Sequence, residues 1–186
     1  MPNILDYFNE IVPLSEKEIM DFKSILYPVE LAKGDTFLKY GQKSDRIGFI
    51  EDGLLEMTII KDDTENMLDF LFSNSFASDY LGFLLNTTSN TQITALRKSK
   101  LMCFKKEDLD ILYNSSIRFQ KIGRVIAERY YISFVERLRI NYLPPKERYE
   151  ILRSNFPEFI QQIPQYKIAS FLGVSAEWLS KLRAKK

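Results

Sequence analysis

Residues 33–53 read KGDTFLKYGQKSDRIGFIEDG, and this stretch decides the fold of the N-terminal part of the chain. Two short apolar runs lie between turn-forming sequences. The runs are Thr36–Leu38 and Arg46–Glu51, and the turn-forming sequences are Lys33-Gly34-Asp35, Gly41-Gln42 and Asp52-Gly53. Glycine and aspartate are typical of tight turns between strands. The spacing therefore predicts short strands that follow one another closely.

The same pattern of short apolar runs separated by turn-forming residues continues on both sides of this stretch, from Val29 to Phe104. Further strands are expected at Leu54–Ile60, Met67–Phe72, Gln92–Leu96 and Lys100–Phe104. Short strands joined by tight turns predict an antiparallel barrel or sandwich. The segment 75–90 is less regular, and no element is predicted there.

Helices are expected before and after the strands. Ser15 followed by Glu18 is a capping box that predicts a helix over residues 15–26, which Pro28 ends. After Lys105 the apolar residues recur at three- and four-residue steps. This spacing predicts helices over 107–113, 115–143 and 145–155. Strands followed by helices predict an α+β fold.

The predicted helix over 115–143 is unusually long, since helices average about 11–12 residues. It needs a partner to pack against along its whole length, which is either the barrel or its copy in a dimer.

Composition excludes several classes of function. The 186 residues include no histidine and one cysteine, Cys103, so a Ser-His-Asp triad, an internal disulfide and a cysteine-cluster metal site are excluded. We expect Cys103 to be a buried structural thiol, because it lies in an apolar strand. No 18-residue apolar run and no secretion signal is present, which predicts a cytoplasmic protein.

The net charge of +1 hides an asymmetry between two parts of the chain. Residues 1–116 hold 12 Lys and Arg against 19 Asp and Glu, a net −7, and residues 117–186 hold 14 against 6, a net +8. An acidic module joined to a basic one indicates that the basic part meets a polyanion.

The last residues, IPQYKIASFLGVSAEWLSKLRAKK (163–186), predict a helix-turn-helix from Tyr166 to Arg183. Ala169 is small where the two helices come closest, and Gly173 allows the positive φ of the turn. Ser175 is a natural N-cap for the second helix. The apolar positions that hold the helices together are Ile168, Leu172, Val174, Leu179 and Leu182.

The polar face of this motif favours DNA over an ordinary helical hairpin. A recognition helix needs side chains that reach base edges and cations that hold phosphates. Glu177 can accept from cytosine and Lys181 can donate to guanine. The residues expected to bind DNA are Lys167, Ser175, Ala176, Glu177, Ser180, Lys181, Arg183 and Lys185.

The chain resembles the Crp/Fnr family, the regulators related to the cyclic-AMP receptor protein. The resemblance rests on the glycine pattern of residues 33–53, on the long helix, and on residues 168–175 with 179–183. It covers nearly the whole chain. The family's Arg-Glu-x-x-x-Arg recognition face falls on Ala176, Glu177 and Lys181, so the first basic reader is missing and we expect a different DNA site.

The resemblance implies a cyclic-nucleotide-binding-type antiparallel β-barrel (jelly roll), a long dimerisation helix and a small helix-turn-helix domain of winged-helix-like type. It places them at residues 1–114, 115–143 and 144–186. It implies as partners double-stranded DNA, a second copy of the chain, RNA polymerase and an unknown small-molecule effector. The dimer contacts it implies on the long helix are Ile122, Val125, Ile126, Arg129 and Ser133.

The family's nucleotide cassette is degenerate here. Its Gly-Glu pair is missing, and no Lys or Arg occurs from Asp62 to Leu96 to neutralise a cyclic phosphate. We therefore expect no binding of cyclic AMP, and no cofactor, because an iron–sulfur cluster needs several cysteines and haem in the family's style needs histidine. The residues that would line a ligand pocket are Asp79, Tyr80, Leu81, Ser89, Asn90 and Thr91.

Two alternatives remain open at the level of sequence. The chain could be a small-molecule sensor whose shortened C-terminal part contacts a protein. An enzyme would have to use the carboxylate pairs Glu51-Asp52 and Asp62-Asp63, which lie in predicted turns where acidic residues are ordinary, so we expect no enzyme. The wealth of aromatic residues, 14 Phe and 10 Tyr, is expected to fill the core rather than to line a pocket.

Overall fold

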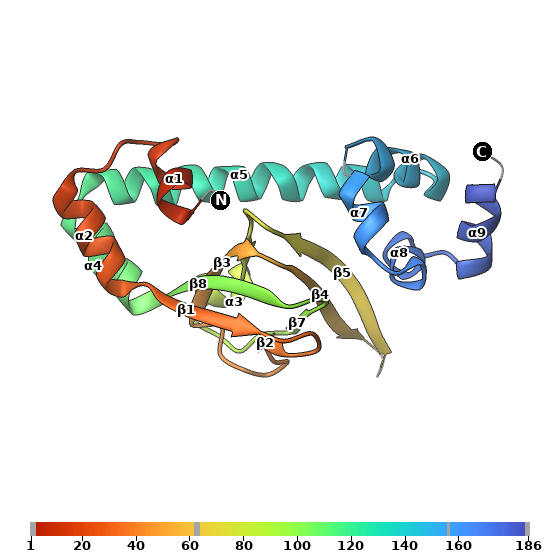
Figure 1. The fold of residues 1–186 in the computed structure, drawn as a ribbon, viewed down its shortest axis with the longest axis horizontal. Helices are drawn as coiled ribbons and strands as arrows, with labels where there is room; N and C mark the ends of the chain where they lie inside the picture. Colours follow the sequence, from red (N-terminus) through yellow and green to blue (C-terminus); the bar gives the residue numbers. More distant parts are fainter. Residues whose placement is uncertain (1–2, 62–63, 156, 185–186) are drawn as a thin grey trace. The chain divides into compact units, whose positions relative to one another are not determined.

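A computed structural model describes residues 3–61, 64–155 and 157–184 (Figure 1). The chain divides into two compact units, Met1–Ala127 and Glu128–Lys186. The division falls within one long helix, whereas the sequence predicts boundaries at both ends of that helix. Asp62 and Asp63, one of the two carboxylate pairs considered above, lie outside the described residues.

The first unit contains two four-stranded antiparallel sheets. One sheet has the strand order β1 (Tyr27–Leu31), β8 (Ser99–Lys105), β3 (Arg46–Asp52), β6 (Phe76–Ala77). The other has the order β2 (Thr36–Leu38), β7 (Thr91–Ala95), β4 (Leu54–Lys61), β5 (Thr64–Phe72). The fold is a β-sandwich combined with helices, which agrees with the predicted α+β class and with the predicted strands.

The space between the two sheets is filled by apolar side chains. In β3, Gly48 allows a close approach of β8, because a Cβ there would lie 2.7 Å from Leu101 Cδ2. Among the large aromatic residues, Phe37 belongs to this interior cluster. The buried members are Leu31, Phe37, Leu38, Ile50, Leu55, Leu71, Ala77, Ile93, Ala95, Leu101 and Cys103.

A second core lies between the helices and the β1-β8-β3-β6 sheet, and most of the buried phenylalanines belong to it. The helices that contribute are α1 (Ile4–Asn9), α2 (Glu16–Ile25), α3 (Tyr80–Leu85), α4 (Lys106–Ser115) and the first turns of α5 (Ile117–Asn141). Phe8 and Phe22 have ring centroids 4.7 Å apart, and Phe22 also meets Phe104 and Phe119. Most phenylalanines of the first unit therefore fill its core, as expected.

Local sequence explains where several elements begin. Ser15 caps α2 by accepting from the Glu18 amide, and the Glu18 carboxylate accepts from the Ser15 amide, so the predicted capping box is confirmed. β1 contains Pro28, and it lies at the edge of its sheet, where a strand can lack one amide donor. α1, β1, β6 and α3 were not predicted from the sequence.

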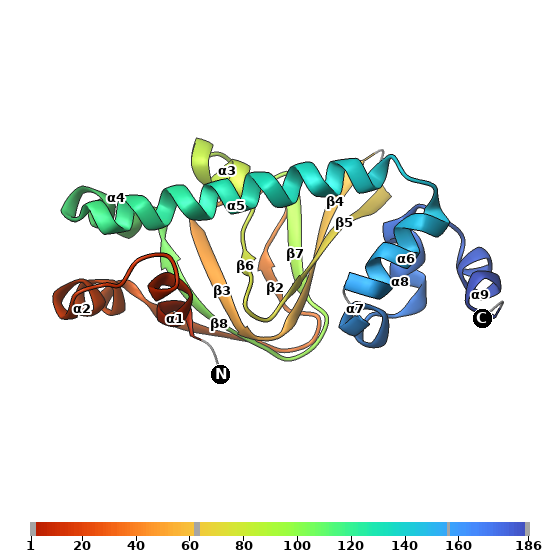
Figure 2. The same ribbon diagram turned by 90° about the horizontal axis from the view of Figure 1, so that it is seen from above.

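The second unit is helical in the residues that the structure describes (Figure 2). After the remaining turns of α5, α6 (Pro145–Asn155) contacts α7 (Pro157–Gln162) and α8 (Gln165–Leu172), and α8 contacts α9 (Ala176–Ala184). No strand occurs in the described part of residues 128–186, so these residues do not bear out the winged-helix-like part of the prediction. No described helix is long and apolar enough to span a membrane.

Candidate functional site

The predicted helix-turn-helix stretch consists of α8, a short turn and α9. Gly173 ends α8 in the left-handed region, with φ 65° and ψ 35°, as the sequence predicted for the turn. Its amide donates back to the carbonyls of Ala169 and Ser170, which closes the helix end. The hydroxyl of Ser175 accepts from the Trp178 amide at 3.1 Å and so caps α9.

The two helices are held together by the apolar positions that the sequence singled out. Ile168, Leu172 and Leu179 are each no more than 1% exposed. Ala169 is also buried, as expected for the small residue where the helices approach. A further contact comes from α6: Arg148 Nη2 donates to the Leu172 carbonyl at 2.6 Å, at the end of α8. Arg148 was not predicted from the sequence, because the type of a charged residue does not reveal which carbonyl it reaches.

The opposite face of α9 is exposed and mostly polar. It begins at the capped N-terminus and carries one acidic residue, followed by two basic residues in the last turn. Lys167 on α8 is half-buried, with its ammonium 5.5 Å from the centre of the Tyr166 ring. Lys185 lies outside the described residues. The exposed residues expected to bind DNA are Ser175, Ala176, Glu177, Ser180, Lys181 and Arg183.

This face presents polar groups of two kinds. Lys181 and Arg183 offer cations to phosphates, and Glu177 offers an acceptor close to the N-terminus of α9, where a recognition helix meets base edges. Ala176 offers neither a donor nor an acceptor in its side chain.

The six residues expected to line a nucleotide pocket do not converge on one point. Tyr80 is half-buried and packs against the helical core beside Phe83, whereas Leu81 is 68% exposed. Ser89 and Thr91 are buried, and Asn90 between them is exposed. Neighbouring residues therefore point in opposite directions on α3 and at the start of β7.

The polar groups of this region are already hydrogen-bonded to one another. Ser89 Oγ accepts from the Thr91 amide at 3.0 Å and lies 3.0 Å from Thr91 Oγ1. The Asp79 carboxylate caps α3 by accepting from the Gly82 amide at 3.1 Å. A cyclic phosphate at the start of α3 would meet this carboxylate, and like charges repel.

Cys103 lies inside the β-sandwich. It is fully buried, and burial raises the pKa of its thiol to about 12. The thiolate is the reactive form of cysteine, so this residue is a structural thiol, as the sequence predicted.

The residues expected to form a dimer contact on α5 differ in their exposure. Ile122 is 2% exposed because it packs into the helical core of its own unit. Ile126 packs partly against the same core, and Val125 is half-buried. Arg129 and Ser133 are exposed.

Large apolar side chains are exposed further along α5. Tyr131 is 67% exposed, Phe134 50% and Leu138 46%. They follow one another at steps of three and four residues, so they lie on one face of the helix. The sequence shows this spacing but does not separate the buried part of the helix from the exposed part.

Comparisons with known proteins show which protein families and structures the chain resembles. A family model described as the cyclic nucleotide-binding domain matches residues 28–116. No curated protein sequence matches the chain.

Solved structures of regulators resemble the chain over most of its length. FixK2 from Bradyrhizobium japonicum is 11% identical, with a TM-score of 0.69, and the match covers 87% of this chain and 84% of FixK2. The c-di-GMP-responsive global regulator CLP from Xanthomonas campestris is 16% identical, with a TM-score of 0.64, over 92% of this chain and 91% of CLP.

The catabolite activator protein of Thermus thermophilus is 15% identical, with a TM-score of 0.56. The match covers 94% of this chain and 84% of the activator protein. At these identities the likeness shows the fold alone. The chain therefore contains a cyclic nucleotide-binding domain, within a fold similar to that of CAP- and FixK-type transcription regulators.

Proposed function

We propose that this chain is a DNA-binding transcription regulator of the Crp/Fnr type, which acts as a homodimer and reads a palindromic site through α9. The observation that carries the proposal is the exposed polar face of α9, presented by a left-handed turn at Gly173 and a cap at Ser175. The likeness in fold to CAP- and FixK-type regulators supports it.

Electrostatics support DNA as the partner of the second part of the chain. Residues 117–186 carry a net charge of +8. On α9, Lys181 and Arg183 are exposed, because the contact of α9 with α8 is made by its apolar face. Contacts between such cations and phosphates supply much of the affinity of regulators for DNA.

The exposed seam on α5, which consists of Tyr131, Phe134 and Leu138, supports the homodimer. Side chains of this size are costly to leave in water, and a contiguous apolar patch marks an interaction site. Apolar residues at three- and four-residue steps are the pattern by which two helices pair. A second copy of α5 offers the same seam, so one symmetric contact covers both.

The effector of this regulator is proposed to be different from cyclic AMP. Ser89, Thr91 and Asp79 are bonded within the domain, and residues 62–96 include no cation. A phosphate monoanion would have to be buried there without a compensating charge, which is unfavourable.

DNA binding is tested with the DNA that lies upstream of the chain's own gene, by fluorescence anisotropy. The double variant Lys181→Ala/Arg183→Ala is expected to bind at least about tenfold more weakly, because two phosphate contacts are lost. The matched control is Lys17→Ala/Lys23→Ala, which removes two exposed cations from α2. Equal affinity of both double variants would refute the assignment of α9.

The homodimer is tested by sedimentation equilibrium. Phe134→Lys places a charge in the α5 seam and is expected to shift the protein toward the monomer. Ile111→Lys is the control, because Ile111 is also an exposed apolar residue on a helix (67% exposed) but lies outside the seam. A dimer that survives Phe134→Lys unchanged contradicts this interface.

One observation favours a second candidate function, a sensor whose C-terminal helices contact a protein. Tyr166 on α8 is 63% exposed and Trp178 on α9 is 36% exposed, and exposed aromatic residues are enriched in protein interfaces. For this candidate, Trp178→Ala would abolish capture of a protein partner, and the variants of Lys181 and Arg183 would leave that capture unchanged.

A further inference from the structure

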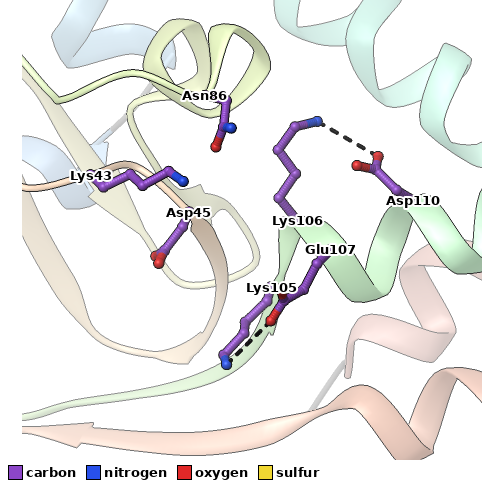
Figure 3. A pocket seen from close by; sticks show the side chains of 7 residues that line it. All are labelled: Lys43, Asp45, Asn86, Lys105, Lys106, Glu107 and Asp110. Carbon is purple, nitrogen blue, oxygen red and sulfur yellow. Dashed lines mark hydrogen bonds and ion pairs between the residues drawn. The ribbon is translucent and has the colours of Figure 1, made fainter.

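The first unit contains a polar cavity lined by other residues than those expected to line a nucleotide pocket. Its volume is about 250 Å³, and Figure 3 shows the side chains around it. They come from the segment before β3, the end of α3 and the junction of β8 with α4. The lining residues are Lys43, Asp45, Asn86, Lys105, Lys106, Glu107 and Asp110.

The charges around this cavity balance, because its lining contains three lysines and three carboxylates. Four of the six are used within the lining: Lys105 pairs with Glu107 at 3.5 Å, and Lys106 with Asp110 at 3.6 Å. The remaining two, Lys43 and Asp45, have no side-chain hydrogen bond or ion pair with any other residue that the structure describes. One positive and one negative group are therefore available to a ligand.

The backbone holds these two groups and Asn86 in place. Lys43 is paired with Thr88 by an isolated β-bridge, and the Ser44 amide donates to the Thr87 carbonyl. The Asp45 carbonyl accepts from the Lys106 amide at 2.9 Å, which ties the segment before β3 to the start of α4. The backbone that carries Lys43 and Asp45 is therefore fixed, and the side chains of Lys43, Asp45 and Asn86 are exposed.

Asn86 adds a third polar group. It ends α3 in the left-handed region, with φ 56°, and its carboxamide is directed toward the hollow, as is the ammonium of Lys43 (Figure 3). An amide beside an ammonium can hold both oxygens of a carboxylate.

We infer that this cavity binds a small zwitterion of the α-amino-acid class, with its carboxylate between Lys43 and Asn86 and its ammonium on Asp45. An anion without a cationic group would be repelled by the Asp45 carboxylate, which it cannot neutralise. A simple cation would be repelled in the same way by the Lys43 ammonium. Drug-sized ligands occupy roughly 300–1,000 Å³, so the smaller volume suits a ligand of this class. The lining has no apolar residue, which favours a ligand with a small or polar side chain.

The inference does not depend on DNA binding, and its test uses none. Isothermal titration of the full chain with L-amino acids of small and polar side chain is expected to find at least one that binds. Of its two fragments, the carboxylic acid without the amine and the amine without the carboxylate, each is expected to bind at least about tenfold more weakly, because one charge-assisted contact is lost.

The variants Lys43→Met and Asp45→Asn are each expected to weaken binding of that amino acid by at least about tenfold. Lys33→Met, which removes an exposed lysine outside the cavity, serves as the control, and circular dichroism checks that every variant is folded. The inference is overturned if no amino acid binds, if the carboxylic acid alone binds as tightly as the amino acid, or if Lys33→Met weakens binding as much as Lys43→Met.

Discussion

Glu18 joins α2 to the segment that begins α5, and this junction makes stability depend on pH. One oxygen, Oε2, accepts from the Ser15 amide at 2.8 Å and from Arg118 Nη1 at 3.1 Å, and Oε1 accepts from the Ser116 hydroxyl. The side chain of Glu18 is 10% exposed. The bond from Ser116, followed by the bonds from Ser15, lowers the pKa of Glu18 from its ordinary value of 4.5 to about 2.

The direction of the pH effect follows from this lowered pKa. The unfolded chain takes up a proton near pH 4.5, before the folded chain does, so the stabilisation is complete above that pH and is lost as the pH falls toward 2. A difference in pKa of this size corresponds to at most about 3 kcal/mol of unfolding free energy.

The variant Glu18→Gln tests this reasoning, because glutamine keeps the shape and cannot ionise. Urea unfolding followed by circular dichroism is expected to show a destabilisation that is smaller by about 2 kcal/mol at about pH 3 than at about pH 6. Glu16→Gln, an exposed change in the same helical turn, is the control and should show little effect at either pH. A destabilisation by Glu18→Gln that is the same at both pH values would refute the role of its ionised form.

Two further predictions concern single residues. Gly173→Ala is expected to lower the free energy of unfolding by about 1 kcal/mol, because its φ of 65° is unfavourable for a side chain, and Gly173→Asn should lower it less; chemical denaturation measures both. Burial raises the pKa of the Cys103 thiol to about 12, so this thiol should react slowly with a thiol reagent in the folded protein and quickly in urea. An exposed cysteine introduced by Leu84→Cys should react quickly under both conditions. Rapid labelling of Cys103 in the folded protein would contradict its burial.

The strands and the capped helices could be predicted from the sequence because their signals are local. Ser15 and Glu18 are three residues apart and bond to each other, and the turns around Gly34 and Gly41 have positive φ, as turn glycines often do. β6 has two residues and α3 has six, which is too short for a periodic pattern to stand out. β1 was not predicted because it contains Pro28. Proline argues against a strand, since it is tolerated there only where its missing amide donor is not needed.

The candidate sites were harder to predict because periodicity shows that a residue is buried but not what buries it. Ile122 and Phe134 belong to one apolar pattern along α5, yet Ile122 packs into its own unit and Phe134 is exposed. The polar cavity unites Lys43, Asn86 and Lys106, which are far apart in the sequence and carry no common motif. The spacing around Gly173 could be read, by contrast, because the whole motif lies within one short segment.

The salt dependence of DNA binding tests the proposed regulator most directly. The slope of the logarithm of the binding constant against the logarithm of salt concentration reports the number of phosphates that the protein neutralises, about 0.9 for each. Lys181→Ala/Arg183→Ala should make this slope shallower by about 2 for each copy of α9 bound, relative to the unaltered chain. An unchanged slope, or no binding of the unaltered chain to any DNA tested at low salt, would contradict the assignment of α9 as the DNA-reading helix.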